Sequence, residues 1–461
     1  MLNIKQILES TEGRLKNGSK DYIVKNYVID SRTAQNEDFF IPIVGDNNNG
    51  HDYILNCVEK GICGYFIEKS EKNKEQIISQ SKNINKDICI IEIINSQNAL
   101  YEIGKYNRNL HIDIPVIAVT GSVGKTSTRE MISSILSTKY TILTTYKNYN
   151  GYIGLSLMLL KLDNQELAIL EHGIDCIGEM DKLVSASLPN TAVITMIGTA
   201  HIGIIGSQDK IFEEKLEIAK YMDENCTLIL NSDDKYLNSY YNDKIKLIKY
   251  NIKDVSDIKI DEICTEFKTK IYDTEHIIKL YEVGEHNIYN VLASIKVAQL
   301  YKIETEYIIK GIEEYKNQSR RFERMVINDN IEIIDDTYNA SIDSMKSGIK
   351  AMSLLKAKRK IVILGDMLEL GDYSNDLHIE VGKLFKDINI DILFTLGEKS
   401  KLISKEAKKH INDVKEFDKR EKLIEVLCDS IKEEDLIYFK ASNGMKFNDI
   451  IKEVKEYLEN K

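Results

Sequence analysis

The sequence lacks long apolar runs, paired cysteines and tryptophan, and it has only three prolines. No stretch approaches the roughly 18 uninterrupted apolar residues of a membrane-spanning helix, and charged residues interrupt the first twenty positions, so we expect neither a membrane segment nor a signal peptide. The seven cysteines stand singly, without a Cys-x-x-Cys pair, a pattern that argues against a disulfide framework and a thiolate zinc site. We therefore expect a cytoplasmic protein with reduced, mostly buried cysteines.

A basic excess is also missing, because the formal net charge is -11. Nucleic acid bound without regard to sequence requires a concentrated basic surface, so we expect no nucleic-acid partner. Hydrophobic residues make up 43% and charged residues 29% of the chain, as in ordinary globular proteins. A length of 461 residues is too great for one core and suggests three domains at about 150 residues each.

Alternating apolar runs and helical stretches predict an α/β fold with three domains. Residues 1–106 form a small α/β unit, 107–318 a central unit and 319–461 a third unit. Continuous apolar runs between helices indicate a mainly parallel sheet covered on both faces in the central unit, and even spacing indicates a Rossmann-like sheet in the third. The predicted strands are 116–119, 167–170, 192–195 and 228–230, then 331–334, 360–364, 392–396 and 436–439.

A phosphate-binding loop follows the first central strand. Gly121 and Gly124 form a turn that ends in Gly-Lys-Thr at the start of an amphipathic helix. Backbone N–H groups there converge on phosphate, the Lys125 ammonium neutralises β/γ oxygens, and the Thr126 hydroxyl reaches magnesium. The usual glycine five residues before Gly124 is replaced by Val119, and a plain glycine turn is the alternative interpretation. The predicted nucleotide contacts are Gly121, Ser122, Val123, Gly124, Lys125, Thr126 and Ser127.

This shorter loop, Thr-Gly-Ser-Val-Gly-Lys-Thr at residues 120–126, resembles the ATP loop of the Mur ligases and folylpolyglutamate synthetases. Further blocks similar to those of the family follow in order over nearly the whole chain. The resemblance implies an ATP-dependent amide-bond ligase with a central P-loop-type ATPase domain and two magnesium ions. The catalytic residues that it implies are Lys125, His201, Lys215, Arg321 and Asp336.

Three predicted metal-site residues follow strand ends or lie on a helix. Glu171 at the end of a strand matches the glutamate that binds magnesium with the loop threonine, Thr126, and carboxylate and hydroxyl oxygens suit this ion. His201 matches a histidine that helps to hold a second magnesium, and Lys215 matches a carbamylated lysine whose carbamate binds metal. Taken alone, these residues are a surface acid, an ordinary histidine and a solvated lysine.

Two further residues complete the expected nucleotide site. Asn287, in Gly-Glu-His-Asn at 284–287, resembles the asparagine that contacts adenine, because an amide offers both a donor and an acceptor. Arg321 stands where the family has an arginine that meets the γ-phosphate through bidentate bonds as domains close. A helix-capping cluster and a structural ion pair are the alternatives. Asn150, in an Asn-rich segment, is expected to contact substrate.

Two blocks in the third unit resemble the branch of the family that adds D-alanyl-D-alanine to the UDP-linked muramoyl tripeptide. The first is Asp-Asp-Thr-Tyr-Asn-Ala at 335–340, in which Asp336 is implied to contact the ribose of ATP and Tyr338 and Asn339 the reacting centre. The second is Gly-Asp-Met-Leu-Glu-Leu-Gly at 365–371, followed by His378. Both imply that residues 319–461 bind the incoming dipeptide, and an acidic turn is the alternative for the first block.

The first unit resembles the domain that holds the UDP end of the substrate. The expected substrate-binding residues there are Ser31, Arg32, Gly45 and His51, for which turns and caps are the alternative. The third residue of the tripeptide is left open, and a monomer is expected.

Several positions depart from the family pattern: Asn49, Ile342, Ala441 and Asn443 stand where aspartate, proline, glycine and arginine are usual. These departures leave open a related ligase for another amino substrate. A third possibility is a nucleotide-binding switch or scaffold without ligase activity.

Overall fold

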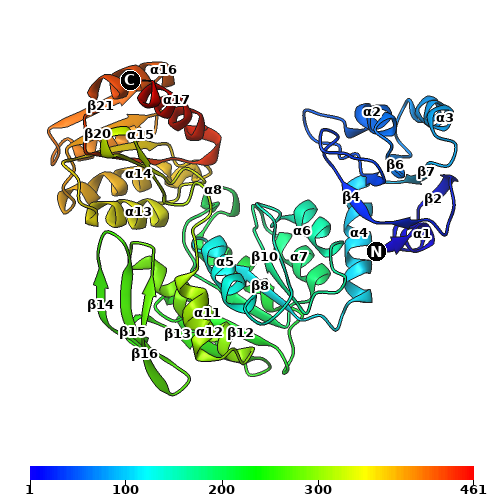
Figure 1. Ribbon diagram of the computed structural model, residues 1–461, viewed down its shortest axis with the longest axis horizontal. Helices are drawn as coiled ribbons and strands as arrows, with labels where there is room; N and C mark the ends of the chain where they lie inside the picture. The colour runs from blue at the N-terminus through cyan, green and yellow to red at the C-terminus, as the bar shows by residue number, and fades with distance from the viewer. Residues whose placement is uncertain (461) are drawn as a thin grey trace.

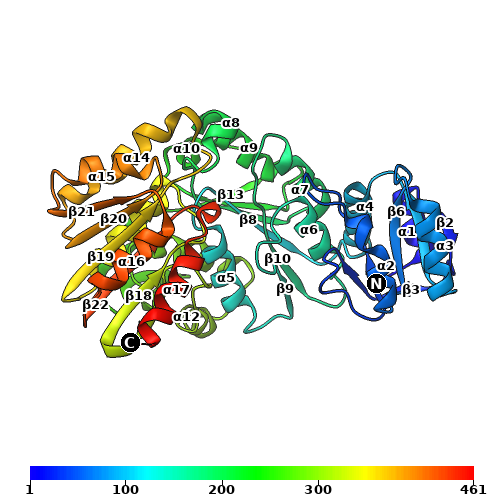
Figure 2. The ribbon, with the colours of Figure 1, turned by 90° about the horizontal axis from the view of Figure 1, so that it is seen from above.

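The computed structural model describes residues 1–460 as three α/β units. Figure 1 shows the first and third units on either side of the central one, and Figure 2 shows the three in a row. Within residues 1–460, none of the helices combines the length and the hydrophobicity of a membrane span. The seven cysteines are free thiols, of which six are buried and Cys176 is exposed, which confirms the expectation of unpaired cysteines in the core.

The first unit contains a five-stranded sheet in the order β2-β7-β6-β5-β4, with only β2 antiparallel to its neighbour. Its elements are β1 Leu2–Asn3, α1 Ile4–Thr11, β2 Arg14–Asn17, β3 Ile23–Val24, β4 Asn26–Val28, β5 Asp38–Phe40, η1 Gly50–Tyr53, α2 Ile54–Glu59, β6 Gly64–Glu68, α3 Lys74–Ile84, β7 Cys89–Ile93 and α4 Ser96–Leu110.

Helix α4 runs across the joint predicted at residue 106 and packs on the central unit. The Asn107 side chain donates to the carbonyls of Leu159 and Leu162, at 2.8 and 3.0 Å. Arg108 is fully buried and donates to the Ser187 carbonyl at 2.8 Å. These contacts attach the end of the helix to the central unit, and the domain limits stay a prediction.

The central unit contains a parallel six-stranded sheet in the order β13-β12-β11-β8-β10-β9 and an antiparallel sheet β14-β15-β16. Its strands are β8 Val116–Thr120, β9 Ile142–Thr144, β10 Leu167–Glu171, β11 Thr191–Ile194, β12 Thr227–Asn231, β13 Lys246–Tyr250, β14 Val255–Ile260, β15 Thr265–Ile271 and β16 Thr274–Leu280. Its α-helices are α5 Lys125–Leu136, α6 Tyr152–Leu159, α7 Glu179–Ser187, α8 Ile202–Ile205, α9 Gln208–Leu216, α10 Lys235–Ser239, α11 His286–Leu300 and α12 Thr305–Glu313.

The first four residues of strand β8, 116–119, are all apolar because helices cover both faces of the strand. Ile117 and Val119 belong to the core formed with α5, α11 and α12, whereas Val116 and Ala118 belong to the core formed with α6 and α7. Side chains alternate between the two faces of a strand, so a doubly covered strand needs apolar residues at every position. This confirms the prediction of a parallel sheet with two covered faces.

The third unit has a six-stranded sheet in the order β17-β18-β22-β19-β20-β21, parallel except for β17. Its elements are β17 Glu323–Ile327, β18 Ile331–Asp335, α13 Ile342–Leu354, β19 Arg359–Gly365, η5 Gly371–Tyr373, α14 Ser374–Lys383, β20 Ile392–Leu396, α15 Ser400–Ala407, β21 Asp413–Phe417, α16 Arg420–Ser430, β22 Asp435–Lys440, η7 Asn443–Met445 and α17 Phe447–Glu459. Each of the eight strands predicted for the central and third units is present within one or two residues.

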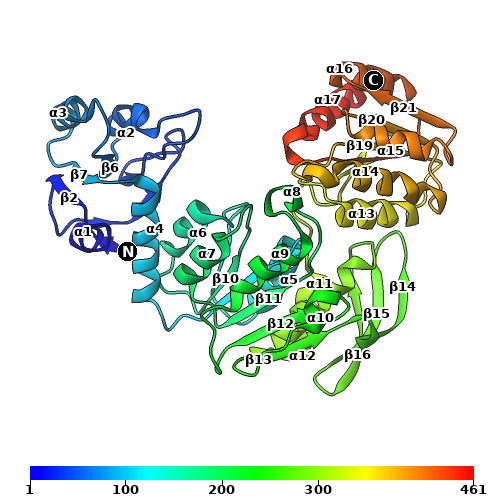
Figure 3. The ribbon, with the colours of Figure 1, turned by 180° about the vertical axis from the view of Figure 1, so that it is seen from behind.

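The third unit contacts the central unit at helix α8, as Figure 3 shows from behind. The Gly203 N–H donates to the Glu369 carbonyl at 2.9 Å, and the Tyr373 hydroxyl donates to the Gly206 carbonyl at 3.1 Å. A Cβ at Gly203 would lie 2.3 Å from the Gly371 nitrogen, so this approach of two backbones requires glycine.

Candidate active site

The phosphate-type loop connects β8 to α5. Gly121 and Gly124 have φ angles of 146° and 85°, and a Cβ at Gly121 would lie 1.9 Å from Thr195 Oγ1. Helix α5 begins at Lys125, so its free N–H groups and the positive end of its dipole face the loop. The geometry fits an anion at this helix N-terminus, as the sequence predicted.

Lys125 lies over the loop, where its Nζ donates to the Gly121 carbonyl at 2.8 Å. Burial lowers the pKa of Lys125, the nearby Glu171 carboxylate opposes this shift, and Arg321 adds to it. Two cations close together destabilise each other unless an anion joins them. The loop therefore favours a polyanion between Lys125 and Arg321.

The Glu171 carboxylate at the end of β10 has two side-chain donors. Thr126 Oγ1 donates to Glu171 Oε2 at 2.9 Å, and Asn150 Nδ2 donates to Oε1 at 2.8 Å. Glu171 is 3% exposed, and a buried carboxylate needs positive charge or several donors. The structure thus brings together three residues, Glu171, Thr126 and Asn150, that the sequence placed at the metal and substrate sites.

His201 lies at the contact between the central and third units. It immediately precedes α8 with a φ of 62°, and its Nδ1 lies 2.6 Å from Glu369 Oε2 and 3.6 Å from Asp175 Oδ1. Burial lowers the pKa of His201, whereas both carboxylates raise it. Sequence analysis did not select Asp175, which lies in the loop after β10, or Glu369, which lies in the turn before η5. Both residues are distant from His201 in the chain.

Lys215 on α9 is buried, with 2% of its surface exposed. Burial lowers its pKa well below the ordinary value, and the nearby Lys125 lowers it further. Its side-chain nitrogen has no hydrogen bond or ion pair within residues 1–460. The alternative of a solvated surface lysine is therefore wrong, because this amine is desolvated.

Asn287 lies in the first turn of α11 and borders the same cavity of about 130 Å³ as the phosphate-type loop. Its Oδ1 accepts from Asn290 Nδ2 at 3.4 Å, and Asn290 Oδ1 accepts from Thr128 Oγ1 at 3.1 Å. This chain of hydrogen bonds ties Asn287 to α5, and its contact with adenine stays a prediction.

Arg321 reaches from the joint before the third unit to the loop. Its Nη2 donates to Thr126 Oγ1 at 2.9 Å, and its guanidinium lies 4.1 Å from the centre of the Tyr338 ring. Arg321 forms no ion pair with any residue in the described part of the chain. The alternative of a structural ion pair is not supported, and the guanidinium is left for a ligand anion.

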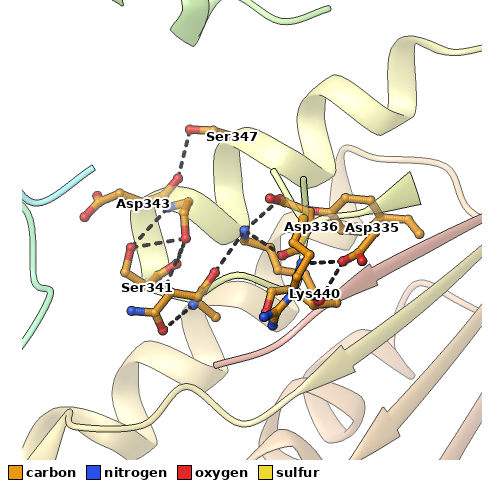
Figure 4. Close-up of polar contacts among 12 residues, drawn as sticks. Asp335, Asp336, Ser341, Asp343, Ser347 and Lys440 are labelled. Atoms are coloured by element: carbon orange, nitrogen blue, oxygen red, sulfur yellow. Dashed lines mark hydrogen bonds and ion pairs between the residues drawn. The ribbon is translucent and has the colours of Figure 1, made fainter. Parts of the chain in front are cut away.

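Asp336 follows β18 and is paired with a lysine from the end of β22, as Figure 4 shows. Lys440 Nζ donates to Asp336 Oδ2 at 2.6 Å, and the Tyr438 hydroxyl donates to the same oxygen at 2.8 Å. Lys440 also donates to the Asn339 carbonyl at 3.3 Å. The basic partner of Asp336 was not selected as a site residue, although the sequence places Lys440 at a strand end.

A larger cavity of about 780 Å³ joins these residues and receives side chains from all three units. Lys125, Glu171 and His201 lie on its central wall, and Arg321 lies where the central unit meets the third. Residues 338–341, 368–370 and 442–444 form its wall on the third unit, and Ile29 and Gln97 reach it from the first unit. The cavity can accommodate a long substrate beside the nucleotide site.

In the first unit, the expected substrate residues lie on exposed turns with one exception. Arg32 forms a two-point contact with Asp30 and lowers the pKa of that carboxyl to about 2. The Ser31 carbonyl accepts a hydrogen bond from Lys60 Nζ at 2.7 Å. A Cβ at Gly45 would meet the Asn48 carbonyl oxygen at 3.9 Å, an ordinary contact distance.

His51 is the exception, because it is 3% exposed and both ring nitrogens are used inside the unit. Its Nδ1 contacts Asn49 Oδ1 at 2.8 Å, and its Nε2 accepts from the Glu68 N–H at 3.0 Å. Neither nitrogen is left for a ligand, so the structure gives His51 a structural task. Its substrate contact stays a prediction. Asn49, one of the departures from the family pattern, accordingly serves to orient this histidine.

Sequence analysis also missed a half-buried carboxyl next to the nucleotide cavity. Glu282 accepts from the N–H of Asn317 at 3.1 Å and from its Nδ2 at 2.6 Å, and Asn317 borders the cavity. Tyr315 donates to Asn317 Oδ1 at 2.8 Å. Burial raises the pKa of Glu282 to about 7 from an ordinary value of 4.5. These residues lie too far apart in the chain for a local motif to reveal them.

We expect the Glu282→Gln variant to be more heat-stable than wild type at pH 8, with a difference that shrinks as the pH falls. Because the folded-state pKa is raised, the stabilising effect of Glu282 is complete below about pH 4.5 and is lost as the pH rises through about 7. Thermal midpoints at pH 5.5 and 8 should reveal a change of a few degrees in the difference. Glu275→Gln, an exposed change on β16, is the control, and a pH-independent difference would contradict the assignment.

Comparisons with known proteins agree with this geometry. The sequence-family model of the Mur ligase middle domain matches residues 119–298. The family model of the Mur ligase glutamate ligase domain matches residues 320–443. The chain is 32% identical to the UDP-N-acetylmuramoyl-tripeptide–D-alanyl-D-alanine ligase of Bacillus subtilis, with 98% of each chain covered. It is 26% identical to the enzyme of that name from Escherichia coli, with 87% of each covered.

Solved structures share the whole fold. A crystal structure of MurF from Acinetobacter baumannii has a TM-score of 0.84 at 26% identity, with 98% of each chain covered. The MurF ligase from Thermotoga maritima, solved in complex with ADP, has a TM-score of 0.80 at 24% identity, with 96% of this chain and 100% of that chain covered. The latter likeness concerns the fold alone.

Proposed function

This chain belongs to the Mur ligase family, and we propose that it is the ATP-dependent ligase that joins D-alanyl-D-alanine to UDP-N-acetylmuramoyl-tripeptide in peptidoglycan synthesis. The observation that carries the proposal is the cavity of about 780 Å³, in which the phosphate-type loop faces a wall from the third unit. ATP, the UDP-linked acceptor and the dipeptide are small-molecule substrates that the three units can bind together. Since ATP and UDP-linked precursors occur in the cytoplasm, we place the protein there.

The reaction proceeds in two steps. An oxygen of the terminal carboxylate of the tripeptide attacks the γ-phosphorus of ATP, so that an acyl phosphate forms and ADP leaves. The dipeptide amine then attacks the acyl carbon, the C–O bond to phosphate breaks, and the nitrogen loses a proton as the amide forms. Lys125 and the loop N–H groups stabilise phosphate charge in the first step, and the arrangement of the domains provides proximity in both.

The residues beside the loop fit magnesium. The buried Glu171 carboxylate and the Thr126 hydroxyl oxygen lie 2.9 Å apart and are hard ligands of the kind that this ion prefers. The described residues contain no group of three or more His, Cys, Asp or Glu side chains that could hold a metal. Magnesium commonly binds through one or two carboxylates together with substrate phosphates and water. When bound, magnesium supplies positive charge to the phosphates, and we assign its sites to Thr126, Glu171, His201 and Lys215.

Carbamylation of Lys215 explains why a lysine is buried here without a partner. The lowered pKa favours the neutral amine, which attacks carbon dioxide, forms an N–C bond and releases a proton. The product is an anion, so it relieves the repulsion from Lys125 and offers two oxygens to a cation. The carbamate is therefore the form of Lys215 that suits the predicted second metal site.

We assign the remaining substrate-binding roles according to the unit in which each residue lies. Residues 1–106 bind the UDP end through Ser31, Arg32 and Gly45, and 107–318 bind ATP, with Asn287 at the adenine. Asp336 contacts the ribose, and residues 319–461 bind the dipeptide beside Tyr338 and Asn339, which line the cavity.

A ligation assay with the purified protein tests the function. Phosphate release should require both the UDP-linked tripeptide and D-alanyl-D-alanine, and the pentapeptide product should be detected by mass spectrometry. Acceptors that differ in the third residue, other dipeptides and single amino acids should be compared in parallel. Release with another amino substrate would identify a different ligase, and phosphate release without any acceptor would identify a nucleotide switch.

Arg321→Ala should raise the activation free energy by about 2 to 4 kcal/mol, which lowers kcat roughly 30- to 1,000-fold. ATP affinity should change much less. The guanidinium contacts Thr126 of the loop from the joint between two units, so its charge acts on phosphate when the units are close. Arg321→Lys should rescue poorly because an ammonium lacks the planar fork. Steady-state kinetics and direct ATP titration are the measurements. Loss of ATP binding with unchanged turnover would make Arg321 an ordinary binding residue.

A further inference from the structure

Arg320, the neighbour of Arg321, lies behind the cavity wall of the third unit. Its φ of 66° is in the left-handed region, which residues other than glycine, asparagine and aspartate rarely adopt. Glu323 Oε2 accepts from the Arg320 N–H at 2.9 Å, and the Arg320 carbonyl accepts from the Tyr338 N–H at 3.1 Å. Hydrogen bonds thus hold this backbone conformation on both sides. The two side chains have different partners, because Arg320 contacts Thr337 and Asn443 whereas Arg321 contacts Thr126.

The Arg320 guanidinium connects two segments of the third unit. Its Nη2 donates to the Thr337 carbonyl at 2.5 Å and to Asn443 Oδ1 at 3.0 Å, and its Nε donates to Thr337 Oγ1 at 3.2 Å. A guanidinium has no acceptor, so the atom of Asn443 that it contacts must be the amide oxygen. The Asn443 NH₂ group is therefore left as a donor, and the positive charge behind it strengthens that donor.

Asn443 lines the part of the cavity wall that comes from the third unit, and in residues 338–341, 368–370 and 442–444 this part contains no lysine or arginine. Among the described residues of the cavity wall, only Lys125 and Arg321 carry a permanent positive charge, and both contact the phosphate-type loop. The Lys440 ammonium is engaged by Asp336. The acid that the third unit contributes to the cavity, Glu369, contacts His201. Several polar side chains of the third unit line the cavity, and Asn443 is the one among them that contacts Arg320. It can therefore offer an anion a donor with a positive charge behind it.

We propose that the Asn443 amide, polarised by Arg320, holds the terminal carboxylate of the incoming dipeptide. The proposal rests on the function above, in which the dipeptide amine must point at the acyl carbon. An extended dipeptide spans about 7 Å, so its carboxylate lies well away from the phosphates. A carboxylate held in the cavity needs a hydrogen-bond donor, and a positive charge nearby strengthens that bond. Asn443 supplies the first and Arg320 the second, which makes Arg320 a positioning residue.

The test compares D-alanyl-D-alanine with its C-terminal amide, which keeps the amine and the shape but removes the negative charge. Wild type should prefer the free carboxylate. Arg320→Ala and Asn443→Ala should each raise KM for D-alanyl-D-alanine about tenfold or more, with little change for the amide, so the preference should collapse. KM for ATP and for the UDP-linked acceptor should stay within about twofold. Because the preference is a ratio, a smaller folded fraction of a variant does not alter it.

Two further variants sharpen the result. Arg324→Ala is the matched control, because Arg324 pairs with Glu332 outside the cavity, and it should keep the wild-type preference. The exchange Arg320→Asn with Asn443→Arg moves the charge onto the cavity wall and leaves the left-handed position to a residue that tolerates it, so it should restore the preference.

The outcomes separate this inference from the function on which it rests. If wild type does not ligate D-alanyl-D-alanine at all, the proposed function fails. If wild type ligates it but both alanine variants keep the preference for the carboxylate, the role of Arg320 and Asn443 is overturned. A rise in KM for the acceptor in place of the dipeptide would likewise overturn it, because Asn443 would then belong to the acceptor site.

Discussion

Replacing Lys125 with alanine should abolish ligation and leave the fold intact. Within residues 1–460, the hydrogen bond of Lys125 Nζ goes to the Gly121 carbonyl of the loop, and the side chain lines the cavity. Lys125 therefore contributes charge at the phosphate site and little to core packing. At an effective dielectric constant of about 20, a unit charge 4 Å from a phosphate charge is worth about 4 kcal/mol before desolvation. Loss of such a stabiliser lowers turnover by about 10²- to 10³-fold or more.

The measurement is product formation under saturating substrates, with circular dichroism to confirm folding. Lys310→Ala, a change at an exposed lysine of α12 that pairs with Glu314, is the control and should behave as wild type. If Lys125→Ala keeps more than a tenth of the activity, the assignment of the loop to phosphate is wrong.

Replacing Lys215 with alanine should leave the enzyme nearly inactive at ambient bicarbonate. The side chain is buried beside Lys125 without a partner of its own, so its removal takes away the carbamate oxygens expected at the metal site. A high concentration of a short carboxylic acid, such as formate or acetate, should restore part of the activity by filling the vacated space.

A second readout does not depend on activity. Wild type equilibrated with ¹³C-bicarbonate should show a carbamate carbon signal by NMR, and Lys215→Ala should lack it. Lys220→Ala, at a half-exposed lysine that pairs with Asp181 and Glu217, should keep both the signal and the activity. An active Lys215→Ala variant would remove Lys215 from the site.

Secondary structure was predictable where the information lies within a short stretch of chain. The eight strands were found because helices cover both faces of the two mainly parallel sheets, so the middle of each strand is mostly apolar. Strands β14–β16 were missed, since that sheet is antiparallel and partly exposed. Buried positions of β15 alternate with half-buried or exposed ones, and β14 is exposed along most of its length. The joint predicted at residue 106 fell inside α4 because helical periodicity carries no sign of which unit a helix packs against.

The sequence by itself determined the phosphate-type loop, the parallel sheets and the residues at strand ends, because each depends on neighbours within a few positions. Only the tertiary structure decided which of these residues act together. Asp336 meets Lys440, His201 meets Glu369, and Arg320 meets Asn443 across more than a hundred residues of chain. Burial was decided there too: Lys215 has the sequence context of a solvated helix, but the packing of α9 against the rest of the central unit removes it from water. Desolvation depends on what packs around a group, and its neighbours along the chain do not specify that packing.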